Sequence, residues 1–392
     1  MAHQALGTGG TMRRRAMFGL LDRDGWTWAS LKALFWFLFI IFVMGYLPDR
    51  AYYFTVFSTI DLGIRNDALT PVNFCPPENL SLPCPAPAGA VLPWQGAPKE
   101  LYLPAGRRDG VAIQVGTHLL YVGGTDGTAA VSTVYEADLY SDGNFSAWRE
   151  GPALPAPRAK PAVGFFSGSV YVVGGTDATG SPTTTVFVLT PDAQTGELAK
   201  WIAADGSDKT VPTLTLPEGR FGASFVAAGD GIVVLGGSDA SGPTTTVWKA
   251  SLNAKGVLQA WQPQAPLTAF GDRPRADATA LLSGNEIFVI GGVDAKGPTA
   301  EVLRGDLSTA TSTTASKVVR WGTATNAGAN LPAPRTDAAG FTANGALYLA
   351  GGTDGTGPKS DVWWTTPDAN GALTGWKSLS VSDLPAGGLV GG

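Results

Sequence analysis

Five aspartates occupy the same place in a pattern that recurs along this chain, two residues after a pair of glycines. They are Asp126, Asp177, Asp239, Asp294 and Asp354. A ring of carboxylates could bind calcium, but each calcium ion takes at least about six oxygen ligands. An aspartate in a turn commonly accepts hydrogen bonds from its own backbone instead, in an Asx turn. Because every repeat has one such aspartate, we expect the structural role.

Arginines make up a second recurring set, and each stands just before a new repeat begins. They are Arg158, Arg220, Arg275 and Arg335, together with Arg107 or Arg108 before the first repeat. A guanidinium group donates paired hydrogen bonds to carboxylates. Two roles follow from that chemistry. Each arginine pairs locally and stiffens the junction between repeats, or several point into a common funnel and bind carboxylates or an acidic partner peptide.

The residues between these two sets predict four short strands in each repeat. In the last copy, Ala338–Thr342 alternates as a strand, Asn344–Gly345 is a tight hairpin turn, and Ala346–Ala350 is a near-continuous apolar run. A further strand follows the aspartate turn, and a lone tryptophan begins the fourth. Self-similarity at roughly 50–60 residues indicates a repeat architecture, and four antiparallel strands per repeat make a propeller blade. We therefore predict an all-β propeller.

Three features together resemble the Kelch repeat: the double glycine, an aromatic residue on the third strand, and a tryptophan at the start of the fourth. The third-strand aromatics are Tyr135, Phe187, Trp248 and Trp363, and the fourth-strand tryptophans, expected in the core, are Trp148, Trp201, Trp261, Trp321 and Trp376. The resemblance covers about residues 103–385 and implies a propeller that places the arginines and the turn aspartates on one face. It does not imply one function, because Kelch-like propellers include binding modules, a copper oxidase and a sialic-acid mutarotase.

The scarcity of histidine and cysteine excludes one kind of catalytic site and leaves little room for another. Of two histidines and two cysteines in the chain, only His118 falls within the repeats. A copper site of the galactose-oxidase kind needs imidazole and thiolate-linked tyrosine ligands, so it is excluded. Ser-His-Asp catalysis would depend on His118, in the first hairpin turn and away from the arginines. The sequence predicts no catalytic residue, no metal site and no cofactor, although acid–base chemistry by carboxylates stays open.

The N-terminal part predicts a membrane anchor. Residues 1–25 form a basic tail that contains Arg13–Arg15, and residues 26–48 form an apolar span with a single charge, Lys32. As a helix, the 22 residues 26–47 reach about 33 Å, enough to cross a hydrocarbon core of about 30 Å. Because the arginines precede the span, we expect a single pass with the N-terminus in the cytoplasm and the propeller outside the cell membrane. The alternative is a cleaved signal peptide, although no Ala-x-Ala-like site follows the span.

Residues 49–102 form a proline-rich connector that contains Cys75 and Cys84. In an exported loop these two cysteines favour a disulfide, because that compartment is oxidising. A metal site is the alternative, but two thiolates without a nearby histidine fall short of four ligands.

The connector also bears on how the ring closes. Trp94, followed by Leu103–Pro104, repeats the ending of the later blades and predicts an orphan fourth strand. We expect the propeller itself to span residues 103–392. Either five blades close directly, or the tail and residues 51–102 assemble a degenerate sixth blade, which is the arrangement we favour.

Charge and the apolar span narrow the function. Beyond residue 50, 21 lysines and arginines stand against 29 acidic residues, so nucleic acid is not expected as a partner. The span is crowded with aromatics, including Phe35, Trp36 and Phe37, which pack well against other transmembrane helices. We expect a membrane-tethered, extracytoplasmic protein-binding or assembly module, an accessory subunit of a membrane complex, rather than an enzyme. The alternative is a carbohydrate-active enzyme of the sialic-acid mutarotase kind.

Overall fold

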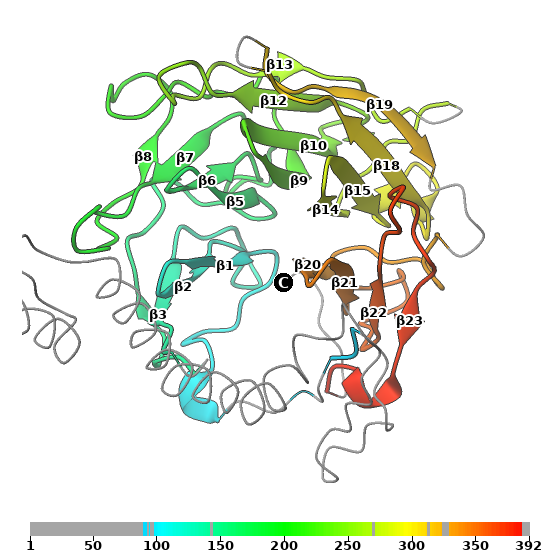
Figure 1. Ribbon diagram of the computed structural model, residues 1–392. Coiled ribbons are helices and arrows are strands. Elements are labelled where there is room, and N and C mark those ends of the chain that lie inside the picture. Colours follow the sequence, from blue (N-terminus) through cyan, green and yellow to red (C-terminus); the bar gives the residue numbers. More distant parts are fainter. Residues whose placement is uncertain are drawn as a thin grey trace, which may run out of the picture. The chain divides into compact units, whose positions relative to one another are not determined.

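The computed structural model describes residues 89–91, 94, 98–141, 144–268, 271–311, 314–323 and 329–385. These residues form five antiparallel sheets of four main strands each, arranged as blades in a ring (Figure 1). The arrangement is a β-propeller, which confirms the predicted all-β fold. The five blades follow the five predicted repeats in chain order.

Each blade takes its four main strands in chain order, from the ring axis outward (Figure 1). Blade 1 consists of β1 (Val111–Val115), β2 (His118–Val122), β3 (Val134–Asp138) and β4 (Arg149–Glu150). Blade 2 consists of β5 (Ala162–Phe166), β6 (Ser169–Val173), β7 (Val186–Leu189) and β8 (Ile202–Ala203). Blade 3 consists of β9 (Phe221–Ala228), β10 (Gly231–Asp239), β12 (Val247–Ser251) and β13 (Gln262–Pro263), with the short β11 (Gly242–Pro243) beside β10.

The last two blades follow the same plan. Blade 4 consists of β14 (Thr279–Ser283), β15 (Glu286–Ile290), β18 (Val302–Leu307) and β19 (Val318–Thr323), and the short strands β16 (Val293–Asp294) and β17 (Gly297–Pro298) pair with each other. Blade 5 consists of β20 (Ala339–Ala343), β21 (Ala346–Ala350), β22 (Val362–Thr365) and β23 (Lys377–Ser378). Two single-turn 3₁₀ helices, η5 (Lys99–Leu101) and η6 (Ser380–Ser382), lie before the first blade and after the last.

The second strand of each blade is largely buried, as its continuous apolar sequence predicts. Every residue of β6 and of β21 is buried. The hairpin turn before β21 is also as predicted, because Asn344 and Gly345 have φ of 49° and 76°, the left-handed values that a type I′ turn requires.

A blade cannot bury both of its faces alone, and the core lies between neighbouring blades. Between blades 2 and 3, for example, Phe166 and Tyr171 belong to the same buried cluster as Trp248 and Trp261. The innermost strands β1, β5, β9, β14 and β20 contact one another in that order.

A repeated indole bond fixes the outer edge of each blade. A tryptophan just before or within each fourth strand donates its indole N–H to a carbonyl in the connection that ends the preceding unit. The bonds run from Trp148 to Leu101 (3.1 Å), Trp201 to Pro152 (2.9 Å), Trp261 to Leu214 (2.6 Å), Trp321 to Ala265 (2.8 Å) and Trp376 to Ala329 (2.9 Å). Trp94 makes a bond of the same kind to Ser382 (2.8 Å).

Several predictions from the sequence lie outside the described residues. These are the basic tail 1–25, the membrane span 26–48 and the disulfide between Cys75 and Cys84. Within the part of the chain that the structure describes, no helix has the length and apolar character needed to cross a membrane.

Candidate functional site

The double glycines and the arginines belong to one junction. In the first four of the five pairs, the second glycine donates its backbone N–H to the carbonyl of the arginine that ends the same blade. The bonds run from Gly124 to Arg158 (2.8 Å), Gly175 to Arg220 (2.7 Å), Gly237 to Arg275 (2.7 Å) and Gly292 to Arg335 (2.7 Å). A Cβ on the first glycine, such as Gly174, would collide with that carbonyl. The glycine pair is needed for this close approach of two backbones.

The guanidinium groups of the same arginines fasten each blade to the next. Three of them stack on a third-strand aromatic ring, as does Arg107 before the first blade: Arg107 on Tyr135 (5.3 Å to the centroid), Arg158 on Phe187 (4.7 Å), Arg220 on Trp248 (4.8 Å) and Arg335 on Trp363 (4.3 Å). All four junction arginines that accept from a glycine also donate to a side chain of the following blade: Arg158 to Thr185, Arg220 to Thr246, Arg275 to Glu301 and Arg335 to Asp361. Arg275 has no aromatic ring to stack on, because Leu303 occupies the position of the third-strand aromatic. Its guanidinium instead forms an ion pair with Glu301.

Four of the predicted arginines are withdrawn from solvent. Arg158, Arg220, Arg275 and Arg335 are 1–4% exposed. Burial lowers the pKa of Arg158 and Arg275 below the usual range of arginine. These contacts are the ones expected if the arginines stiffen the junctions between blades. A ligand-binding role for the set stays a prediction.

The structure shows which of the two adjacent arginines before the first blade, Arg107 or Arg108, takes the junction position. Arg107 stacks on Tyr135 and therefore takes the junction position. The side chain of Arg108 is mostly exposed and donates to Thr125, with Asp109 3.5 Å away.

The five turn aspartates accept backbone hydrogen bonds from the residue two positions later. The donors are Thr128 to Asp126 (2.9 Å), Thr179 to Asp177 (2.8 Å), Ser241 to Asp239 (2.7 Å), Lys296 to Asp294 (2.7 Å) and Thr356 to Asp354 (2.9 Å). These bonds define Asx turns. A hydroxyl bond from Thr128, with two backbone bonds, lowers the pKa of Asp126 to about 2.

The aspartate turns and the arginines lie on one face of the ring, as the resemblance implies. The guanidinium of Arg220 is 3.8 Å from the carboxylate of Asp239, and that of Arg275 is 3.9 Å from the carboxylate of Asp294.

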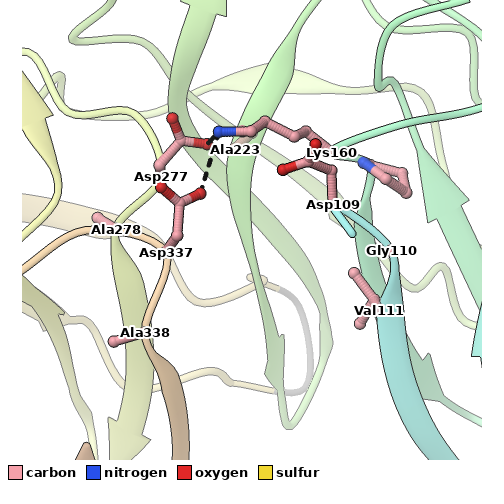
Figure 2. A pocket seen from close by; sticks show the side chains of 11 residues that line it. Asp109, Gly110, Val111, Lys160, Ala223, Asp277, Ala278, Asp337 and Ala338 are labelled. Atoms are coloured by element: carbon pink, nitrogen blue, oxygen red, sulfur yellow. Dashed lines mark hydrogen bonds and ion pairs between the residues drawn. The ribbon is translucent and has the colours of Figure 1, made fainter. Parts of the chain in front are cut away.

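On that face, five residues that each follow a junction arginine by two positions line one hollow at the ring axis (Figure 2). They are Asp109, Lys160, Gly222, Asp277 and Asp337, one from the start of each blade, and we call them the axial mouth. All five have left-handed backbone, with φ of 48–60°. Backbone hydrogen bonds join them in series: Lys160 to Asp109 (2.7 Å), Gly222 to Lys160 (2.9 Å), Asp277 to Gly222 (2.7 Å) and Asp337 to Asp277 (3.0 Å). This series holds five blades in register at the axis.

A lysine from blade 2 is shared between carboxylates from blades 4 and 5. The ammonium of Lys160 is 3.0 Å from Asp277 and 3.0 Å from Asp337 (Figure 2). Gly222 makes this possible, because a Cβ there would collide with the carboxylate of Asp277. The lysine therefore crosses the axis and ties together blades that are not neighbours.

Burial and charge oppose each other at the axial mouth. Burial raises the pKa of Asp277 to about 6, against the attraction of Lys160 and with the help of Asp337. Burial also acts to lower the pKa of Lys160, but the two carboxylates outweigh it and raise that pKa above the usual range. The lysine stays charged, and Asp277 is the group of this pair that titrates closest to neutral pH.

The size of the hollow limits what the axial mouth can hold. Its volume is about 120 Å³, whereas small-molecule sites commonly enclose about 300–1,000 Å³. Its lining includes three carboxylates, those of Asp109, Asp277 and Asp337, and one ammonium, that of Lys160. The arrangement suits a single projecting group of a partner rather than a whole substrate.

A second hollow, of about 480 Å³, lies at blades 1 and 2 and is lined in part by His118, Glu136, Arg149 and Glu197. His118 is the first residue of β2, directly after the hairpin turn in which the sequence placed it. This end of the blade is opposite the arginine face, since β2 runs from His118 to the double glycine.

Sequence reasoning missed the axial mouth. The repeat pattern points to the aspartates and arginines that recur from repeat to repeat. Lys160, Asp277 and Asp337 occupy a position where the residue type differs from blade to blade. One sequence signal could have found these residues. The position two residues after each junction arginine holds a charged residue in four repeats and a glycine in the other.

No protein-family model matches the chain, and no curated protein matches it in sequence. The five-bladed propeller arrangement therefore rests on the sheets and their order, and the likeness to Kelch repeats rests on the motifs within each blade.

Proposed function

We propose that this chain is a membrane-tethered, extracytoplasmic propeller that serves as a protein-binding or assembly module of a membrane complex. The observation that carries the proposal is that the recurring charged side chains make contacts within the propeller itself. The junction arginines are buried between blades, the turn aspartates cap their own backbone, and the axial hollow is small. Among the described residues, this face of the ring offers contacts to a partner, and its hollow is smaller than a common small-molecule site.

A carbohydrate-active enzyme is the weaker candidate, because it would need an arginine free to hold a sugar carboxylate. The larger hollow does contain an arginine, Arg149. Its guanidinium already donates to Glu136 (2.7 Å) and to both oxygens of Asp138 (2.8 Å each).

We also propose that the propeller is of the Kelch type and has a sixth blade position between blades 5 and 1. Trp148 donates to Leu101, in the connection after Trp94, and Trp94 donates to Ser382, in the connection after Trp376. Trp94 thus takes the place of a blade tryptophan between the last blade and the first. In agreement, among the described strands no contact comparable to that between β14 and β20 joins β20 to β1.

The proposed function is tested by extracting the full chain in a mild detergent and sizing it under native conditions. We expect migration with a larger complex. Replacing Phe35, Trp36 and Phe37 with leucine keeps an apolar span but removes its aromatic surface, so the complex should dissociate. Migration of the wild-type chain alone with its micelle, unchanged in the leucine variant, would contradict the proposal.

Site-specific photo-crosslinking then shows which face meets the partner. Exposed positions exist on both faces: Thr128 and Lys296 on the aspartate-turn face, and Thr117 and Asn285 in hairpins of the opposite face. Crosslinks to the same partner from the first pair, and not from the second, are the expected result. Equal labelling from both faces would indicate chance collision.

A further inference from the structure

Three potential metal ligands stand together on one face of blade 1, at the end away from the axial mouth. His118 opens β2, and the strand register places Asp138 of β3 directly opposite and Glu136 two residues earlier on the same face. Such cross-strand neighbours have Cβ atoms about 4.5–5.5 Å apart. The pairing of two strands is therefore enough to bring one imidazole and two carboxylates together.

The distances within this group are those of a coordination sphere. The Nδ1 atom of His118 is 3.0 Å from Glu136 Oε1 and 3.3 Å from Asp138 Oδ1. Ligand atoms that bind zinc at about 2.0–2.2 Å in tetrahedral or octahedral geometry are about 2.9–3.5 Å from one another. An ion could be accommodated by small movements of side chains.

The imidazole nitrogen makes no well-aligned hydrogen bond. Nδ1 of His118 is buried, and its contacts are with the two carboxylates, at 3.0 and 3.3 Å. Nδ1 and the two carboxylate oxygens therefore converge on one point, where the guanidinium of Arg149 donates to both oxygens. One nitrogen and two oxygens suit a divalent transition ion better than calcium, which takes oxygen ligands.

We propose that His118, Glu136 and Asp138 bind a divalent transition-metal ion, with Arg149 as the counter-ion of the empty site. Arg149 contacts the same oxygens that face the imidazole, Glu136 Oε1 and Asp138 Oδ1. Its side chain is 46% exposed, so it has room to swing away. The hollow of about 480 Å³ beside the group leaves space for water ligands, and Glu150 and Glu197 in its wall add negative charge.

Blade 4 supplies a matched internal control. Glu286 stands opposite Asp306 just as His118 stands opposite Asp138, and Arg304 takes the place of Glu136. There the carboxylates are paired with Arg304 and Arg320 and no imidazole is present. The same position of the fold therefore holds an ion-pair network in one blade and a ligand set in the other.

The test is calorimetric titration of the untagged full chain in detergent with Zn²⁺, after removal of metals with a chelator. We expect one Zn²⁺ per chain, and binding at least tenfold weaker in His118→Gln and in Asp138→Asn. Arg149→Gln should bind at least as tightly as the wild type, because the competing cation is gone. Glu286→Gln in blade 4 should leave the affinity unchanged.

Three outcomes would overturn the proposal. One is an absence of Zn²⁺ binding by the wild type in the micromolar range, which would make the group an ion-pair network only. Another is Zn²⁺ binding that His118→Gln leaves intact, since His3 or the cysteines would then hold the ion. The third is loss of binding in Arg149→Gln while circular dichroism and the unfolding temperature show a folded chain.

Discussion

The backbone N–H of Gly175 donates to the carbonyl of Arg220 at 2.7 Å, at the end of the connection that leads out of blade 2. The preceding glycine, Gly174, has φ of 64°, and a Cβ there would collide with the same carbonyl. The guanidinium of Arg220 meanwhile stacks on Trp248 of blade 3. Two motifs that look separate in the sequence are therefore the two sides of one blade junction.

Gly174→Ala should destabilise the propeller by about 2–4 kcal/mol, because the substitution adds a collision to the strain of a left-handed backbone. Gly180→Ala is the matched control, since Gly180 has φ of 81° but open space around its Cβ position. It should cost only about 1 kcal/mol. Urea unfolding of the full chain in detergent measures both, and equal losses would show that the close approach of the two backbones is not what requires glycine.

Arg220→Met should lower the free energy of unfolding by about 2–3 kcal/mol. Methionine fills much of the space, but it loses the stacking on Trp248 and the hydrogen bonds to Thr246 and Glu218. Arg320→Met is the control, because Arg320 is highly exposed and its ion pair with Asp306 is open to solvent. Arg220 is buried, so its guanidinium is not available to a ligand. Any ligand binding by this face should therefore weaken in Arg220→Met only to the extent that the variant is less stable.

The axial mouth predicts a pH dependence of stability. The pKa of Asp277 is raised to about 6 in the folded chain by burial, whereas an unfolded aspartate titrates at about 4. Between these values the folded chain binds more protons than the unfolded chain, so this group's contribution to stability falls as pH rises from about 4 to 6. Asp277→Asn cannot titrate, and its stability relative to the wild type should therefore rise over that range and then level.

Unfolding midpoints at pH 4, 5, 6 and 7 measure that difference. Asp126→Asn is the control with the opposite sign, since hydrogen bonds lower the pKa of Asp126 to about 2. Its contribution is complete above about pH 4 and is lost only as pH falls toward 2, so the control difference should stay flat from pH 5 to 7. A flat difference for Asp277→Asn as well would contradict the assigned burial of its charge.

The repeats were predictable because their signals are local. A double glycine, an Asx turn and an Asn344–Gly345 hairpin each report the backbone conformation of the residues that carry them. The pairing of Lys160 with Asp337 was not predictable in that way, because the two residues are 177 positions apart and meet only when the ring has formed. The roles of the arginines could not be separated either, since a guanidinium makes the same bonds to a neighbouring blade as to a ligand.

The group around His118 lies between these cases. Its pairing with Asp138 follows from the register of one hairpin, and a residue count from the turn could have found it. The composition argued against a metal site, because the repeats contain a single histidine. Only the strand register places two carboxylates beside that histidine.

The proposed sixth blade position predicts that Trp94 stabilises the ring although it precedes all five described blades. Its indole N–H donates to the carbonyl of Ser382, and the hydroxyl of Ser382, fully buried, donates to the carbonyl of Val91 (2.5 Å). Trp94→Phe keeps an aromatic ring and removes only the N–H, so it should cost about 0.5–1.5 kcal/mol.

Trp148→Phe is the matched control for this bond, because Trp148 makes the same kind of bond between Leu101 and blade 1. Ser382→Ala should also be destabilising, because it removes the hydroxyl bond to Val91, whereas the backbone carbonyl that accepts from Trp94 remains. If Trp94→Phe and Ser382→Ala both leave unfolding unchanged while Trp148→Phe lowers it, the segment around Trp94 is not part of the ring. The cycle of indole bonds would then end at blade 1, and the five blades would have to close by a contact other than this one.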